Sequence, residues 1–183
     1  MLDPVAIEAV TAHRANQRVM ELSWLVKILR VHKIERVLEI GCERGGTMWT
    51  WCQVADDGAQ LLGIDREDVP LPAGAGHRGQ HVKMARVDSQ TPEALEAAQA
   101  FFDGPLDFLF IDGDHSAIGV RSDWTTFSPL VQNGGLVAFH DIDSGPSNGV
   151  EAFWREDISK RYRTDEIHCE LPGAPMGLGL VYL

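Results

Sequence analysis

The chain has 183 residues, a length that suits one domain with a substantial hydrophobic core. Its formal net charge is −11, from 16 basic and 27 acidic residues, and its most basic stretch is the short run 160–163. Because nucleic-acid binding requires clustered Lys and Arg, we expect no nucleic-acid partner.

Cysteine usage and apolar runs indicate where the protein works. The three cysteines, Cys42, Cys52 and Cys169, lack the spacing of a metal finger, and their odd number is typical of a reducing compartment. No apolar run approaches the length of a membrane span, and residues 1–12 carry two acids and no signal-peptide pattern. We therefore expect a cytoplasmic protein without a membrane partner.

Helical and strand patterns alternate along most of the chain. Helices are expected over 4–30, 46–55, 92–102, 120–131 and 150–159. Strands are expected over 36–40, 60–65, 81–87, 106–112, 136–139, 162–169 and 177–183. This alternation predicts an α/β fold with a mainly parallel sheet and ligands at the carboxyl ends of its strands. Residues 67–80, rich in Pro and Gly, predict a loop where such folds usually place a helix.

The first predicted helix has an apolar and a polar part. Five apolar residues lie at helical spacing and form one face: Val19, Leu22, Leu25, Val26 and Leu29. The polar stretch 11–17 leaves three alternatives open, namely capping of the sheet, cover of a cofactor site and contact with a second subunit. We treat residues 1–30 as an N-terminal helical cap.

A glycine-rich turn follows the first strand, 36–40. Gly41, Gly45 and Gly46 let the backbone approach a ligand, and the helix that follows offers free N–H groups. The spacing is Gly-x-x-x-Gly-Gly and differs from the Gly-x-Gly-x-x-Gly of dinucleotide-binding folds. With Glu39 two residues before it, the turn reads as a ligand cradle; a plain strand-to-helix turn is the alternative.

Acids and a histidine stand at the ends of several predicted strands. Asp65 ends the second strand 24 residues after Gly41, near the interval of ~20 at which an acid accepts hydrogen bonds from ribose hydroxyls. Asp112 ends the fourth strand, and His140 and Asp141 end the fifth. Because carboxyl ends of parallel strands meet at one edge, we expect these side chains to line the same site.

The residues around the fourth and fifth strands resemble a known family. Phe-Ile-Asp-Gly-Asp-His-Ser over 110–116 and Gly-Gly-Leu-Val-Ala-Phe-His-Asp-Ile over 134–142 are similar to class I S-adenosylmethionine (SAM)-dependent methyltransferases. Within these, they resemble the small bacterial family that includes cephalosporin-hydroxylase-like proteins and sugar or natural-product O-methyltransferases. The glycine-rich turn and Gly-Leu-Gly-Leu-Val over 177–181 fit the same pattern, so the resemblance covers about residues 16–183.

The resemblance implies both a fold and a cofactor. The fold is a Rossmann-like three-layer sandwich in one domain over 1–183, with a seven-stranded sheet of order 3-2-1-4-5-7-6 and an antiparallel strand 7. SAM would lie on the glycine-rich turn with its ammonium near Glu39 and its adenine near Arg66, Asp88 and Ser89. Asp88 and Ser89 also read as a plain loop before a helix. The residues expected to bind SAM are Glu39, Gly41, Cys42, Gly45, Gly46, Thr47, Asp65, Arg66, Asp88, Ser89 and Asp112.

A hydroxyl acceptor must lose its proton, and two devices are available. Cation-dependent relatives hold a metal at positions that match Asp112, His140 and Asp141, although His140 replaces an acid and suits Mn²⁺, Fe²⁺ or Zn²⁺ at least as well as Mg²⁺. Alternatively His115 or His140 is a general base, with Asp112 beside it. The competing interpretations are a helix-start role for His115 and a role for His140 in orienting Asp141. Asp123 is expected to form a structural ion pair.

These features favour an O-methyltransferase for a small hydroxylated acceptor, a sugar or a natural product. The alternatives are a nicotinamide-dependent oxidoreductase and a non-catalytic module that binds SAM or a nucleoside. Five tryptophans and the apolar helix face also predict a homo-oligomer, because aromatic residues are enriched at interfaces; burial of all five in the core is the alternative.

Overall fold

The computed structural model of the protein describes residues 1–145, 148–169 and 176–183. Its strands are β1 Arg36–Ile40, β2 Gln60–Asp65, β3 His81–Arg86, β4 Leu106–Ile111, β5 Val131–His140, β6 Arg163–Cys169 and β7 Met176–Tyr182. Its α-helices are α1 Pro4–Thr11, α2 Val19–Leu29, α3 Gly46–Val54, α4 Pro92–Phe101, α5 Ala117–Phe127 and α6 Gly149–Phe153. A π-helical turn, Trp154–Ile158, continues α6, and 3₁₀ turns cover His77–Gly79 and Ser128–Leu130.

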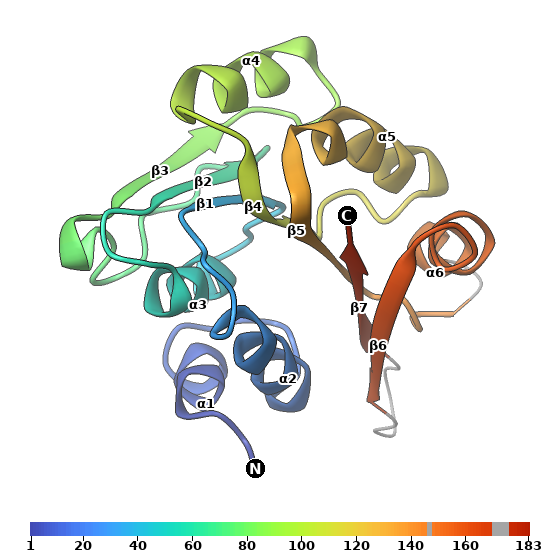
Figure 1. The fold of residues 1–183 in the computed structure, drawn as a ribbon, viewed down its shortest axis with the longest axis horizontal. Helices are drawn as coiled ribbons and strands as arrows, with labels where there is room; N and C mark the ends of the chain where they lie inside the picture. The colour runs from blue at the N-terminus through green and yellow to red at the C-terminus, as the bar shows by residue number, and fades with distance from the viewer. Residues whose placement is uncertain (146–147, 170–175) are drawn as a thin grey trace.

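The described strands form one sheet of order β3-β2-β1-β4-β5-β7-β6 (Figure 1). The first five strands pair in parallel, and β7 is antiparallel to both β5 and β6. This is the order and the strand direction that the resemblance implied. The parallel pairing brings the carboxyl ends of β1, β2, β4 and β5 to one edge.

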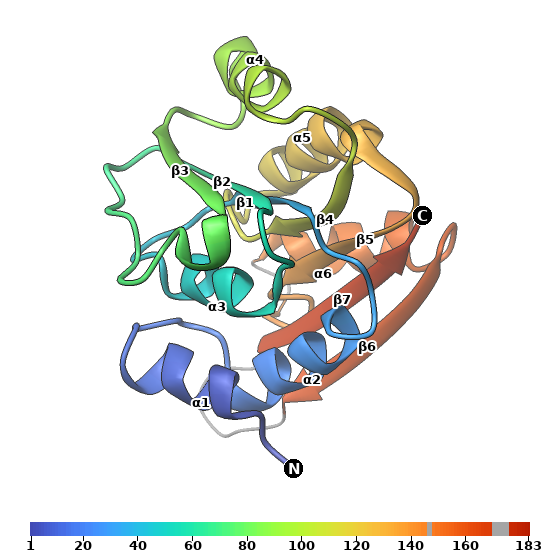
Figure 2. The same ribbon diagram turned by 60° about the vertical axis from the view of Figure 1, so that its left-hand side comes forward.

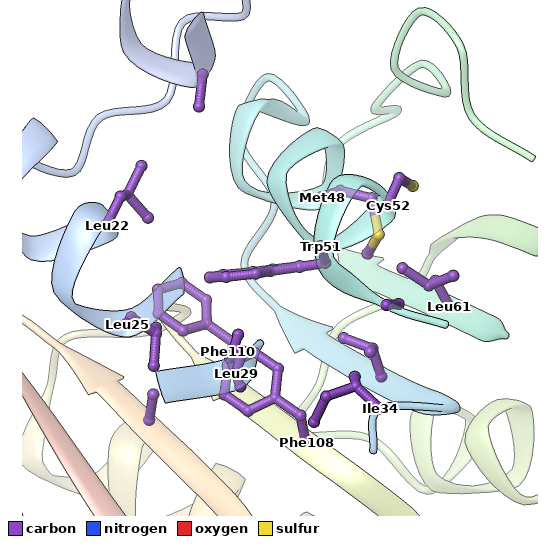
Figure 3. Close-up of a cluster of buried hydrophobic side chains, with 14 of the residues drawn as sticks. Leu22, Leu25, Leu29, Ile34, Met48, Trp51, Cys52, Leu61, Phe108 and Phe110 are labelled. Carbon is purple, nitrogen blue, oxygen red and sulfur yellow. The ribbon is translucent and has the colours of Figure 1, made fainter. Parts of the chain in front are cut away.

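Helices cover both faces of the sheet and make three layers (Figure 1). One face carries α1, α2 and α3, and the other carries α4, α5 and α6. Alternation along β4 feeds both cores, since Phe108 and Phe110 point to the first and Leu109 and Ile111 to the second. Figure 3 shows Trp51 of α3 lying against the β4 phenylalanines, with ring centroids 5.1 Å from each.

The N-terminal cap consists of two helices, so the prediction of one helix over 4–30 is wrong. Arg14 has φ 61°, which an α-helix does not accommodate, and the chain turns there before α2 begins. Arg18 and Glu21 restart the helix, because the Arg18 N–H donates to the Glu21 carboxylate at 2.8 Å. The apolar face expected for α2 is buried and shares a core with Trp51, and Figure 2 shows α2 between α1 and the β6 edge.

The fifth strand begins earlier than the sequence indicated. The helix expected to run to Val131 ends at Phe127, because Pro129 follows within a 3₁₀ turn. β5 then starts at Val131 and includes the two glycines that were expected to stop the helix, whereas the prediction placed it over 136–139. Val131 pairs with Leu106 of β4, and the register shifts before Leu136 pairs with Phe108.

The remaining elements agree with the prediction within a few residues. The helix expected over 150–159 is α6 with its π-helical turn, and the loop 67–80 contains only the short 3₁₀ turn. Residues 146–147 of the predicted loop 142–149, and residues 170–175 between the last two strands, lie outside the described residues. None of the helices in the described part is long and apolar enough to cross a bilayer.

The tryptophans contribute mainly to the core. Trp51 and Trp154 are fully buried and Trp49 nearly so, whereas Trp24 and Trp124 are half-buried. The structure thus accounts for three of the five without a partner subunit, and self-association stays a prediction.

Gly179 of β7 provides a test of the second core. A Cβ at this position would overlap the ring of Trp154. We therefore expect Gly179→Ala to lower the free energy of unfolding in urea by about 1–3 kcal/mol, although Ala otherwise suits a strand better than Gly. The cost should shrink in a Trp154→Leu background, because the smaller side chain leaves room; strictly additive effects of the two changes would contradict the overlap.

Candidate active site

A cavity of about 450 Å³ opens at the carboxyl edge of the sheet, beside the N-terminal cap. It is bordered by the ends of β1, β2, β4 and β5 and by the segment between α1 and α2. The residues singled out from the sequence that line it are Gly41, Cys42, Gly46, Thr47, Asp65, Arg66, Asp88, Ser89, Asp112, His115, His140 and Asp141. Glu39 and Gly45 are the two members of the predicted set that do not.

The glycine-rich turn is held between two backbones. Gly41 has φ 82°, and a Cβ there would overlap the main chain of Asp112 at the end of β4. At Gly46 a Cβ would overlap the backbone of Ala15, in the segment between α1 and α2. Only glycine allows these approaches, so the turn is closed on one side by β4 and on the other by the cap. Among the three alternatives for the polar stretch 11–17, the structure therefore favours cover of this site.

Asp65 fixes the shape of the turn from the neighbouring strand. Its Oδ2 accepts the backbone N–H groups of Cys42 at 2.8 Å and Glu43 at 3.0 Å. Its Oδ1 accepts the N–H of Glu67 at 2.8 Å and keeps capacity for another donor. The carboxylate thus has a structural role, and it remains part of the cavity wall where a ligand could reach it.

Glu39 lies beneath the cavity, where direct contact with a ligand is blocked. Strand alternation turns its fully buried side chain toward α3, and Thr47, which does line the cavity, donates its hydroxyl to the Glu39 carboxyl. Burial raises the pKa of Glu39 to about 8, and the Thr47 hydrogen bond opposes that rise only in part. Any effect of Glu39 on a ligand would therefore pass through Thr47.

Side-chain hydrogen bonds hold the corner after β3. Asp88 Oδ1 accepts the N–H of Gln90 at 3.0 Å, and the Gln90 side chain reaches Asp114 at 2.9 Å. Asp123 is buried close to Gly113, and none of the described residues forms the expected ion pair with it. Burial raises the pKa of Asp123 to about 6, and the nearby Ser89 hydroxyl lowers it only partly.

Two carboxylates and two histidines meet where β4 and β5 end. Asp112 Oδ1 lies 3.3 Å from His115 Nε2 and 3.3 Å from His140 Nδ1. Asp141 Oδ2 lies 3.3 Å from His115 Nδ1. Asp141 has φ 65°, a left-handed conformation that is uncommon for a non-glycine residue and clusters at functional sites.

The two histidines occupy different surroundings. The His140 side chain is 2% exposed, and its Nε2 faces Glu21 Oε2 at 3.5 Å, whereas the His115 side chain is 44% exposed. Ligand atoms of Asp112, His115 and Asp141 all lie within 4.8 Å of one another, a grouping that could hold a metal ion. This possible metal-binding group therefore contains His115 where the sequence suggested His140.

Charge in the cluster moves the pKa values of its members. Burial alone would raise the pKa of Asp112, but the charges and hydrogen bonds of His140 and His115 outweigh it and lower the value to about 2. Burial likewise opposes charging of His140, yet Asp112, Glu21 and Asp141 hold its pKa well above the ordinary value. The hydrogen bond to Asp112 raises the pKa of His115.

Gln17 is a cavity residue that sequence reasoning missed. It lies between α1 and α2, is 4% exposed, and donates from Nε2 to Asp112 Oδ2 at 2.6 Å. Sequence periodicity could not reveal this contact, because the residues are 95 positions apart. The available signal was the polar stretch 11–17 directly before an apolar helix face.

A family model described as a methyltransferase domain matches residues 38–142, more than half of the chain. This chain belongs to the methyltransferase domain family. The match begins within β1 and ends one residue after Asp141, so it contains both the glycine-rich turn and the strand-end cluster. The predicted class I SAM-dependent methyltransferase family is confirmed, whereas Gln17 and the rest of the cap lie outside the match.

Solved methyltransferases share this fold. TomG from Streptomyces achromogenes, an O-methyltransferase solved with SAM, is 18% identical with a TM-score of 0.66, and the match covers 100% of this chain and 91% of TomG. An O-methyltransferase from Bacillus cereus, solved with S-adenosylhomocysteine (SAH), is 14% identical with a TM-score of 0.63, covering 99% and 91%. MycE from the mycinamycin biosynthetic pathway, in complex with Mg, SAH and mycinamycin VI, is 22% identical with a TM-score of 0.58, covering 82% of this chain and 38% of MycE.

A curated relative extends well beyond this domain. The uncharacterized protein y4gI of Sinorhizobium fredii (strain NBRC 101917 / NGR234) is 27% identical over 148 residues. The aligned part is 73% of this chain but only 16% of y4gI.

The pKa of Glu39 yields a stability prediction. Between the ordinary pKa of 4.5 and about 8, the folded protein keeps a proton on Glu39 that the unfolded chain has released. The free energy of unfolding should therefore fall as pH rises through this window, by up to roughly 5 kcal/mol from this group. Urea denaturation at pH 5.5, 7 and 8.5 should show a shallower fall for Glu39→Gln, which removes the ionisation and keeps the Thr47 hydrogen bond. Identical pH dependence in both proteins would contradict this assignment.

Proposed function

We propose that the chain is a SAM-dependent O-methyltransferase domain that acts on a small hydroxylated acceptor, a sugar or a natural product. The observation that carries the proposal is the shared cavity, in which a glycine-rich turn held by Asp65 faces the cluster of Asp112, His115 and Asp141. The first fits the cofactor and the second fits activation of a hydroxyl group. We treat residues 1–183 as one such domain, with residues 1–30 as its cap.

In this proposal the cofactor lies across the turn, with its ribose on Asp65. The free capacity of Asp65 Oδ1 suits a ribose hydroxyl, and Thr47 at the start of α3 suits the amino-acid end. Arg66, Asp88 and Ser89 on the far side of the cavity suit the adenine. TomG and the Bacillus cereus enzyme were solved with SAM and SAH, which supports this choice of cofactor for the fold.

The strand-end cluster fits a divalent cation. The Asp112 and Asp141 carboxylates offer ligand atoms within 4.8 Å of one another, a pair of oxygen donors that suits Mn²⁺ or Mg²⁺, and MycE was solved with Mg. We assign the cation to Asp112 and Asp141. The role of buried His140 in this proposal is to orient the Asp112 carboxylate. When bound, SAM supplies an electrophilic methyl group and the cation supplies a charge that lowers the pKa of a hydroxyl group.

The chain's own residues position the reactants and receive the proton. Methyl transfer from bound SAM would require the acceptor to lose its hydroxyl proton. His115, half-exposed between two carboxylates, would take that proton at a ring nitrogen. Asp112 and Asp141 face its two ring nitrogens and would stabilise the imidazolium that results. The cap and the turn form walls of the cavity that keep the reacting atoms aligned.

Calorimetry with SAH tests the cofactor assignment. Asp65→Ala should weaken SAH binding by about 1.5–3 kcal/mol, the range for hydrogen bonds to a charged group. Asp68→Ala, which removes an exposed acid from the same loop, should leave the affinity unchanged. A 2′-deoxy analogue of SAH should bind wild type more weakly than SAH does, and Asp65→Ala should no longer distinguish the two ligands. Binding of NADH with no binding of SAH would overturn the proposal.

Turnover with labelled SAM and a panel of hydroxylated sugars and phenols tests the strand-end assignments. His115→Ala should lower kcat about 10²–10⁴-fold, because it removes the proton acceptor, while the SAH affinity stays unchanged. Asp141→Ala should abolish turnover. In the wild-type protein, EDTA should abolish turnover as well, and added Mn²⁺ or Mg²⁺ should restore it. Full activity in excess EDTA would remove the cation from the proposal and leave His115 as a simple general base.

A further inference from the structure

Gln17 reaches the strand-end cluster from the cap, outside residues 38–142 that the family model matches. Its Nε2 donates to Asp112 Oδ2 at 2.6 Å, a short hydrogen bond of the kind that an ionised acceptor forms. A carboxylate can only accept, so the amide nitrogen must face Asp112, and this fixes which end of the amide is the oxygen.

The amide oxygen of Gln17, Oε1, is buried and lacks a hydrogen-bond partner in the described part of the chain, although Gln17 lines the cavity. Buried polar atoms in proteins almost always have a partner, so an unpaired one needs an explanation such as a ligand or an ion. Oε1 and Nε2 share one carbon, which places the unpaired oxygen directly beside the Asp112 carboxylate.

We propose that Gln17 Oε1 is an oxygen ligand of the divalent cation held by Asp112 and Asp141. This inference rests on the cation assigned under the proposed function. Hard cations accept amide carbonyl oxygens as well as carboxylates, and Gln17 adds an oxygen without adding a third negative charge. The resemblance implies an acid at position 140, where this chain has His140, and the Gln17 amide would supply the oxygen that is missing there.

A second contact ties the same part of the chain to the cluster. Glu21, fully buried in the first turn of α2, faces His140 Nε2 at 3.5 Å, and its other oxygen is held by no described group. The cap thus approaches Asp112 through Gln17 and His140 through Glu21. Its position is set by Ala15, whose backbone packs on Gly46. The amide of Gln17 is therefore presented by a segment fixed at several points.

Two substitutions separate ligation from mere orientation of Asp112. Gln17→Met keeps the length of the side chain but loses both the oxygen and the N–H group. Gln17→Glu keeps an oxygen ligand and loses only the N–H donor, and its charge repels Asp112 when no cation is present. If Gln17 only orients Asp112, both variants should bind a cation poorly. If Oε1 is a ligand, only Gln17→Met should.

The experiment is a titration of the full chain with Mn²⁺, followed by electron paramagnetic resonance of the free ion, without SAM or SAH. We expect Gln17→Met to raise the Kd for Mn²⁺ about 10–100-fold and Gln17→Glu to bind no more weakly than wild type. Gln99→Met is the matched control, because Gln99 is exposed on α4, away from the cavity lining, and it should bind Mn²⁺ like wild type. Calorimetry with SAH should give the same affinity for all four proteins, which also shows that each is folded.

Three results would overturn the inference. Wild-type Mn²⁺ affinity in Gln17→Met would exclude ligation, and equal weakening in both Gln17 variants would reduce Gln17 to a positioning residue. Absence of Mn²⁺ binding by wild type would remove the cation itself. In that last case SAH binding in the same samples distinguishes the two failures, because a protein that binds SAH and no cation keeps the proposed methyltransferase function.

Discussion

The Asp112 carboxylate is the point on which the arrangement of the site depends. It ends the central strand β4, accepts a hydrogen bond from Gln17 of the cap, and faces His115 and His140 with its other oxygen. Its backbone also closes over the turn at Gly41. One residue therefore connects the cofactor side, the cap and the strand-end cluster, so a shift of any one of them changes the geometry of the others.

The cap is a wall of the site as well as a cover for the sheet. The segment between α1 and α2 packs on the turn through Ala15 and supplies Gln17 to the cavity, and the first turn of α2 brings Glu21 to His140. Ala15, Gln17 and Glu21 lie outside the stretch that the family model matches. The matched stretch thus contains the glycine-rich turn and the strand-end acids, whereas the cap adds Gln17 and Glu21 to their surroundings.

Local patterns in the sequence were enough to predict the strands, the turn and the strand-end acids, because strand alternation and glycine spacing act over a few residues. The sheet order followed from the resemblance to class I methyltransferases. Contacts between distant segments left no such pattern. The pairing of Gln17 with Asp112 and the burial of Glu39 beneath Thr47 depend on how the layers close. The break of the first helix was missed for a related reason, since helical periodicity on both sides hid the left-handed Arg14.

Asp141 adopts a strained backbone conformation at the position of a strand-end carboxylate. Its left-handed backbone, φ 65°, would suit glycine better, and for an aspartate it costs on the order of 1 kcal/mol. Glycine at 141 would relax the backbone but remove the carboxylate that faces His115. Under the proposed mechanism this position sets stability against activity, and engineering aimed only at thermal tolerance would tend to replace this residue first.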